Sequence, residues 1–272
     1  MDATDGRTIT ARLATAAAGF PLLLLLVWLG NPSFTVLVGL LAVVATIELC
    51  SIGRAWGDRP ITPLAVVWAV ALVLAAQFIS GDQSDARTVY PIVTLASITL
   101  MASMLWCHGS GTLLAGIGVT AGAALYTGGL LSHAVLLRDL DQGIEWVFLL
   151  LFVTFAADTA AFFVGRAFGS RPLAPSISPK KTWEGAAAGL AGAIAACVVA
   201  IFALDIDHAA WEPYVLGGVL GVAGQAGDLL VSRLKRIGGV KDSGRTVPGH
   251  GGVLDRLDSV VPNLVVVYYF AI

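Results

Sequence analysis

Three aspartates near the end of the chain have the side chains that metal-assisted phosphate chemistry requires. Asp242, Asp255 and Asp258 lie among lysines and arginines in the glycine-rich stretch 232–258. Carboxylates suit Mg²⁺, which often takes one or two of them plus substrate phosphates, whereas Lys and Arg suit phosphate oxygens. Lysines and arginines are also common in loops where their only role is to fix the orientation of a membrane protein. That role would not explain why the three aspartates lie among them. The stretch therefore predicts a site for metal-assisted phosphoryl or nucleotidyl transfer.

The same stretch contains a turn with the sequence PGHGG. Gly251 and Gly252 let backbone N–H groups come close to an anion. His250 has no second histidine in its loop, so phosphate contact or proton transfer suits it better than zinc binding. The alternative is a purely structural turn. The remaining candidates for phosphate contact or catalysis in this stretch are Ser232, Lys235, Arg236, Lys241 and Arg256.

The spacing of Asp255 and Asp258 predicts that both carboxylates lie on one face of a helix that begins the last apolar segment. We expect both to bind metal. The alternative is ordinary helix chemistry, because acidic side chains are favourable in the first turn of any helix.

Three further acids lie within apolar segments. An ionised carboxylate in lipid costs roughly 2.5–3.5 kcal/mol on insertion scales, so such a residue is functional or paired with a buried cation. Asp158 and Asp228 are therefore candidate metal ligands, and Asp228 has Gln225 and Ser232 as helix neighbours. Glu48 lies near the end of its segment and could reach water, so the sequence favours a functional role less for Glu48 than for the other two acids.

A second basic stretch, SPKKTWEG at 178–185, could bind an anionic lipid headgroup or a nucleotide. Its candidates for substrate binding are Ser178, Lys180, Lys181 and Thr182. Ser178 before Pro179 is typical of a helix N-cap followed by proline, so we expect a helix from Lys180 whose N-terminus favours phosphate. The alternative is a membrane-surface anchor made by the lysines and Trp183.

The segments that must position these residues are long and apolar. The chain has 272 residues, of which 57% are hydrophobic and 12% are charged, whereas soluble domains are about 25% charged. The sequence predicts an all-α, polytopic integral membrane bundle of about nine transmembrane helices, each of roughly 20 residues, forming one domain over residues 1–272. The nine segments are 13–30, 33–50, 63–80, 89–106, 112–131, 145–165, 186–204, 213–231 and 257–272.

Positive charge is divided unevenly between the loops that join these segments. One alternating set of loops holds all of the 16 Lys and Arg residues except Arg87 and Arg138. By the positive-inside rule, that set faces the cytoplasm. We therefore expect a multi-pass protein with the N-terminus and the loops 166–185 and 232–256 in the cytoplasm. We expect the membrane to be a bacterial cell membrane. We expect membrane lipids and no nucleic acid as partners.

Together these motifs resemble the signature of the phosphatidate cytidylyltransferases, also called CDP-diglyceride synthases. Two positions depart from the family pattern, since Val247 stands where Leu, Ile or Phe is usual and Phe162 replaces a usual tyrosine. The motif match spans roughly 158–259, and the first 150 residues resemble the family only in being hydrophobic spans. The matching motifs are SPKKT at 178–182, Glu184-Gly185, Gly227-Asp228, SRLKR at 232–236, Lys241-Asp242, PGHGG at 248–252 and DRLD at 255–258.

The resemblance implies a nucleotidyltransferase of phospholipid biosynthesis. CTP and phosphatidic acid would give CDP-diacylglycerol and pyrophosphate at the cytoplasmic membrane face, with one or two Mg²⁺ ions and a homodimer. Asp228, Asp255 and Asp258 would hold the metal, and Asp158 would be a further metal candidate. The catalytic candidates are Asp228, Lys241, Asp242, Asp255 and Asp258.

Two other classes of protein share part of the pattern. A CTP-using lipid kinase, such as a polyprenol or dolichol kinase-like protein, would have similar spans and phosphate chemistry but would release CDP instead of pyrophosphate. A transporter could line an ion path with Asp158 and Asp228. Transporters often show inverted repeats and midplane sites, whereas this sequence shows no repeat and gathers its polar residues at one face.

Overall fold

The computed structural model divides into two compact units, each described by itself. Unit 1 comprises Met1–Asp139 and Ile237–Leu257, and unit 2 comprises Leu140–Arg236 and Asp258–Ile272. The expectation of one domain over the whole chain stays a prediction. The structure describes residues 17, 19, 21–79, 83–106, 111–244, 246 and 251–272, without the side chains of 83–88, 103 and 106.

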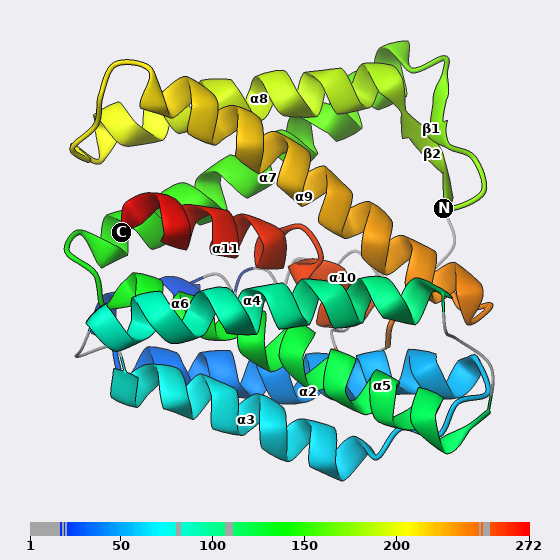
Figure 1. Cartoon of the computed structure of the whole chain (residues 1–272). Helices are drawn as coiled ribbons and strands as arrows, with labels where there is room; N and C mark the ends of the chain where they lie inside the picture. The colour runs from blue at the N-terminus through cyan, green and yellow to red at the C-terminus, as the bar shows by residue number, and fades with distance from the viewer. Residues whose placement is uncertain are drawn as a thin grey trace. The chain divides into compact units, whose positions relative to one another are not determined.

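Long apolar helices make up most of both units (Figure 1). Among the described residues, six helices are long and apolar enough to cross a membrane, and two shorter apolar helices accompany them. This confirms an all-α, polytopic integral membrane protein, while the number nine stays a prediction. The six are Ser33–Ala55, Thr62–Ile79, Leu113–Arg138, Gly143–Phe168, Trp183–Ala203 and Glu212–Ile237, and the shorter two are Val89–Ala102 and Val260–Ala271.

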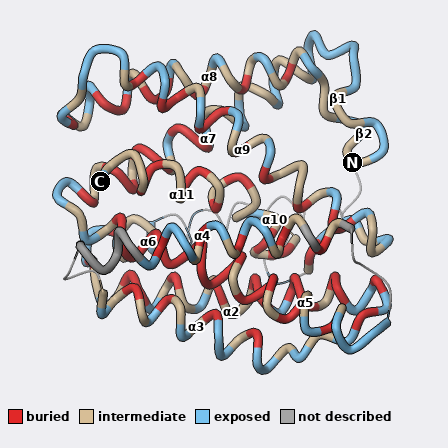
Figure 2. Tube along the Cα trace, in the orientation of Figure 1, coloured by how far each residue is buried: buried red, intermediate tan, exposed pale blue. Residues whose placement is uncertain are grey.

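Unit 1 is a bundle of closely packed helices. Its elements are α2 (Ser33–Ala55), α3 (Thr62–Ile79), α4 (Gln83–Trp106), α5 (Leu113–Ala124), the π-helical stretch Leu125–Gly129, α6 (Leu130–Arg138) and the short α10 (Leu254–Leu257). Small residues permit this packing, since a Cβ on Gly128 would lie only 2.6 Å from the carbonyl oxygen of Ala69 in α3. Helix α6 is buried throughout Leu130–Leu137 (Figure 2). Helix α10 contacts α2, so residues at the C-terminal end of the signature lie against an N-terminal helix.

Unit 2 is built around α7 and α8. Its elements are α7 (Gly143–Phe168), β1 (Pro172–Ala174), β2 (Ser178–Thr182), α8 (Trp183–Ala203), α9 (Glu212–Ile237) and α11 (Val260–Ala271). A Cβ on Gly192 of α8 would lie 2.7 Å from Cβ of Ala160 in α7, and one on Gly217 of α9 would lie 2.6 Å from Cα of Ile194 in α8. Glycine at these contacts lets the helices approach closely, as is common in membrane bundles.

The SPKKT stretch forms a strand, so the expected helix from Lys180 is wrong. Residues Ser178–Thr182 form β2, which pairs antiparallel with β1, and Pro172 lies opposite Thr182. Helix α8 begins only at Trp183, and its N-cap is Thr182, whose hydroxyl accepts a hydrogen bond from the Gly185 N–H at 3.1 Å. A two-stranded sheet consists of edges alone, where proline is tolerated, so Ser178 and the following proline fit the strand as well as they fit a cap.

The expectation that one helix face carries both Asp255 and Asp258 is also wrong. Helix α10 ends at Leu257, and α11 begins at Val260. Asp258 Oδ1 instead accepts a hydrogen bond from the Ser259 N–H at 2.9 Å. Such local bonds from an aspartate to the backbone compete with helix formation, and here the bond falls at the break between the two helices.

Candidate active site

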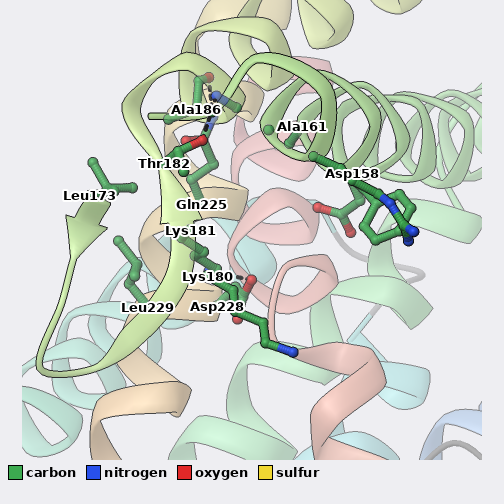
Figure 3. A pocket seen from close by; sticks show the side chains of 15 residues that line it. Asp158, Ala161, Leu173, Lys180, Lys181, Thr182, Ala186, Gln225, Asp228 and Leu229 are labelled. Carbon is green, nitrogen blue, oxygen red and sulfur yellow. Dashed lines mark hydrogen bonds and ion pairs between the residues drawn. The ribbon is translucent and has the colours of Figure 1, made fainter. Parts of the chain in front are cut away.

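Unit 2 contains a pocket of about 690 Å³ lined by residues of α7, β1, β2, α8 and α9 (Figure 3). Its polar side chains include Asp158, Arg166, Lys180, Lys181, Thr182 and Asp228. Apolar side chains, among them Phe162, Leu173 and Leu229, line the same space. Pockets with mostly apolar walls and a few convergent polar groups are typical ligand sites, and cations beside apolar walls suit an amphiphile with an anionic head.

Lys181 and Asp228 form an ion pair in this pocket, although they are far apart in the sequence (Figure 3). Their side chains are 27% and 30% exposed. The second oxygen of Asp228 accepts a hydrogen bond from the Ser232 hydroxyl at 3.2 Å, one helical turn later. The structure therefore brings together three predicted site residues, from the SPKKT stretch and from α9.

Asp258 lies just before α11, outside the helices that could span a membrane. Burial, and to a lesser degree the carboxylate of Asp228, raise the pKa of Asp258 to about 7, and the charge of Lys235 opposes this shift. Lys235 is buried, with 8% of its surface exposed. Gly227 lets α9 come close to the segment Asp258–Pro262, because a Cβ on Gly227 would collide with the Asp258 carbonyl oxygen and with the Pro262 ring. Asp228 and Asp258 are thus mutually repelling carboxylates that a cation would stabilise.

The predicted metal ligands are only partly grouped. Within the described ranges, no three His, Cys, Asp or Glu side chains are arranged to hold a metal ion. Asp228 and Asp258 are electrostatic neighbours, Asp158 lines the pocket from α7, and Asp255 belongs to unit 1. The Asp228 and Asp258 pair fits Mg²⁺, because this ion often takes one or two protein carboxylates and completes its shell with water and substrate phosphates.

The signature loop, defined here as residues 241–256, belongs to unit 1 and is braced by two carboxylates. Asp255 Oδ2 accepts hydrogen bonds from the backbone N–H groups of Ser243 at 2.9 Å and Gly252 at 3.1 Å. The other carboxylate is Glu48 of α2, which is 5% exposed and bonds to several groups of the loop. The suggestion that Glu48 could reach water is therefore wrong. An acid within an apolar segment was the signal that could have identified it.

The other predicted residues of the signature loop differ in their surroundings. Lys241, Asp242 and Arg256 are exposed. Gly251 has φ +86°, and a Cβ there would lie 2.9 Å from Asp255 Oδ2, so this position requires glycine on both counts. His250 lies outside the described residues.

Arg236 connects the end of α9 to the β1–β2 hairpin within unit 2. Its Nε donates a hydrogen bond to the carbonyl oxygen of Ile177 at 3.0 Å. This bond lies one residue before Ser178, at the start of the strand that carries Lys180 and Lys181. The phosphate contact expected of Arg236 stays a prediction; the structure shows that its side chain holds the hairpin whose strand β2 carries Lys180 and Lys181.

Comparisons with known proteins cover nearly the whole chain. The Cytidylyltransferase family matches residues 10–272. A protein of Brucella suis biovar 1 (strain 1330) named phosphatidate cytidylyltransferase is 34% identical over 265 residues, which is 96% of this chain and 93% of that protein. A protein of the same name from Bacillus subtilis (strain 168) is 33% identical over 255 residues, 91% of this chain and 92% of that protein. This chain therefore belongs to the cytidylyltransferase family and is a nucleotidyltransferase.

Proposed function

We propose that this protein transfers the cytidylyl group of CTP to phosphatidic acid and so forms CDP-diacylglycerol and pyrophosphate. The names of the relatives support this substrate pair. The observation that carries it is the pocket of unit 2, where Lys181 and Asp228 lie beside apolar walls. The cations suit the lipid phosphate, and the apolar walls suit the start of the acyl chains.

The proposed reaction needs correct placement of two phosphates more than a protein base. An oxygen of the lipid phosphate attacks the α-phosphorus of CTP and forms a new P–O–P bridge. The bond between the α-phosphorus and the oxygen that bridges to the β-phosphorus breaks, and its electron pair leaves with pyrophosphate. A phosphate monoester has its second pKa near 6, so the attacking group is largely ionised at neutral pH. Lys180, Lys181 and Thr182 would hold that phosphate in place.

Asp228 and Asp258 of unit 2 would hold Mg²⁺, with Asp158 of the same unit as a further candidate ligand. By the family resemblance, Asp242 and Asp255 of unit 1 stay candidates for metal binding. The bound ion would neutralise charge on the triphosphate and on the departing pyrophosphate. Lys235, Arg236, Lys241 and Arg256 would contact phosphate oxygens, and Ser232 would orient Asp228 through the hydrogen bond between their side chains.

The proposed site faces the cytoplasm, because CTP is soluble there and the positive-inside rule puts the loops 166–185 and 232–256 on that side. The lipid substrate enters from the adjoining leaflet. We also expect a homodimer, as the family resemblance implies, which light scattering of the purified protein in detergent would test.

Purified protein in mixed micelles with phosphatidic acid, CTP and Mg²⁺ tests this proposal. We expect CDP-diacylglycerol that depends on both substrates and disappears when EDTA removes the metal. A matched reaction with diacylglycerol instead of phosphatidic acid should give no product, because that lipid lacks the attacking phosphate. Formation of a phosphorylated lipid together with CDP would contradict the proposal and indicate a lipid kinase.

A further inference from the structure

Glu48 is a buried carboxylate. Among the described residues, the four donors that bond to its side chain all belong to the signature loop. Its Oε2 accepts hydrogen bonds from the Ser243 hydroxyl at 2.8 Å and the Leu254 N–H at 2.9 Å. Its Oε1 accepts one from the Val253 N–H at 3.0 Å and a short one from the Thr246 hydroxyl. Each carboxylate oxygen therefore accepts one hydroxyl and one backbone N–H. Only a side chain with two acceptor oxygens satisfies all four donors.

Two of these donors are the backbone N–H groups of Val253, which directly precedes α10, and of Leu254, the first residue of α10. The first N–H groups of a helix have no acceptor within the helix. Glu48 is the acceptor for both of these N–H groups, although they follow it by 205 and 206 residues in the sequence. The position of α10, which carries Asp255 and Arg256, is thereby fixed relative to α2.

The hydrogen bonds continue from Glu48 to Asp255. Ser243 binds Glu48 through its hydroxyl and Asp255 through its backbone N–H. Gly252 donates to the same Asp255 oxygen. The loop packs tightly against the Glu48 side chain. A Cβ on Gly244 would lie 2.6 Å from Glu48 Oε1, and a Cβ on Gly252 would collide with Glu48 Oε2.

We infer that Glu48 is a positioning residue, which sets the signature loop and the Asp255 carboxylate in the geometry that cytidylyl transfer needs. This rests on the proposed function. A charge is costly to bury unless it is paired or hydrogen-bonded, and the four donors offset that cost only when the loop is closed on Glu48. The carboxylate and the closed loop therefore stabilise each other.

Glu48→Gln tests this inference with almost no change of shape. In either orientation the new NH₂ group faces a backbone N–H, of Val253 or of Leu254, which cannot become an acceptor. We expect kcat for CDP-diacylglycerol formation to fall about 100-fold, the loss that a misplacement of about 1 Å can cause. The KM for phosphatidic acid should stay within about threefold, because none of the described residues of this loop (241–244, 246 and 251–256) is among those that line the pocket of unit 2. A variant that merely folds less well would lose active protein and keep its kcat.

Thr46→Val is the matched control. Thr46 is buried two residues away in α2, and its hydroxyl bonds to Ala42 and Thr127 instead of the signature loop. We expect its kcat to stay within about threefold of wild type. Equal kcat in wild type and Glu48→Gln would overturn the inference, as would an equal loss in Thr46→Val.

Limited trypsin digestion gives a second readout that does not depend on activity. Lys241 and Arg256 are exposed and bracket the loop, so Glu48→Gln should be cut faster at both sites while Thr46→Val is not. If the wild-type protein forms no CDP-diacylglycerol but Glu48→Gln is still cleaved faster than wild type, the proposed function is wrong and the role of Glu48 in holding the loop is supported.

A double variant covers the case in which Glu48→Gln does not fold. Ser243→Ala/Thr246→Val removes both hydroxyl donors to Glu48, so we expect it to lower kcat. A normal kcat in this variant would contradict the inference.

Discussion

The two units use charged side chains in different ways. In unit 2, Lys181 and Asp228 are each more than a quarter exposed and line a pocket of about 690 Å³. In unit 1, Glu48 is 5% exposed, and its two oxygens are occupied by four donors of its own chain. Side chains in the first arrangement can exchange partners when a ligand arrives, whereas Glu48 cannot do so without opening the loop.

This difference separates binding from positioning. The pocket supplies groups whose chemistry matches phosphate and metal, and substitutions there should change what the protein binds. Glu48 supplies fixed geometry, and substitutions there should change turnover without changing lipid binding.

Asp258→Asn should nearly abolish activity while the protein stays folded. If Asp258 holds Mg²⁺ as proposed, loss of its carboxylate should remove several kcal/mol of transition-state stabilisation, or about 1000-fold or more in kcat. The change also removes the repulsion from Asp228 that helps to raise the Asp258 pKa, so the thermal midpoint should not fall. Turnover assays and thermal unfolding in the same detergent check both statements. Full turnover by this variant would contradict the metal role.

Lys181→Ala should weaken lipid binding more than it weakens turnover. A hydrogen bond to a charged group contributes about 1.5–3 kcal/mol, so we expect the KM for phosphatidic acid to rise about 10–100-fold. Arg171→Ala is a suitable control, because it removes a cation next to the same hairpin from a residue that does not line the pocket. An unchanged KM in Lys181→Ala, or an equal rise in both variants, would show that Lys181 does not bind the lipid phosphate.

Glu184→Gln should have the smallest effect. Glu184 accepts hydrogen bonds from the Ser170 hydroxyl at 2.7 Å and from the backbone N–H groups of Ser170 and Arg171 at 3.2 and 3.3 Å. It therefore resembles Glu48 in bracing a loop, but its bonds are exposed to solvent, where water can replace a lost partner. We expect kcat and KM within about threefold of wild type. A loss as large as that of Glu48→Gln would mean that burial does not distinguish the two glutamates.

The sequence was sufficient for the membrane fold and for the association of Asp228 with Ser232. Apolar runs of about 20 residues predict membrane helices from composition alone, and residues four apart on a helix are neighbours by geometry. These inferences depend on local spacing only, which a single sequence states directly.

The features that sequence reasoning missed depend on distant partners. Glu48 bonds to residues that follow it by 195 to 206 positions, so no spacing rule could relate them. The sequence around Ser178 predicts a helix cap, because nothing in its local spacing indicates the strand partner β1. The break between α10 and α11 coincides with the hydrogen bond from the Ser259 N–H to Asp258. The spacing of Asp255 and Asp258 is equally compatible with one continuous helix, so it does not reveal this break.

The most direct test follows both ends of the CTP triphosphate in one reaction. CTP labelled at the α-phosphorus with ³³P and at the γ-phosphorus with ³²P is incubated with phosphatidic acid, Mg²⁺ and the purified protein. We predict that ³³P enters the lipid fraction while ³²P stays in the aqueous fraction as pyrophosphate, in equal amounts. Transfer of ³²P to lipid, with ³³P remaining in aqueous CDP, would contradict cytidylyl transfer and identify the protein as a lipid kinase.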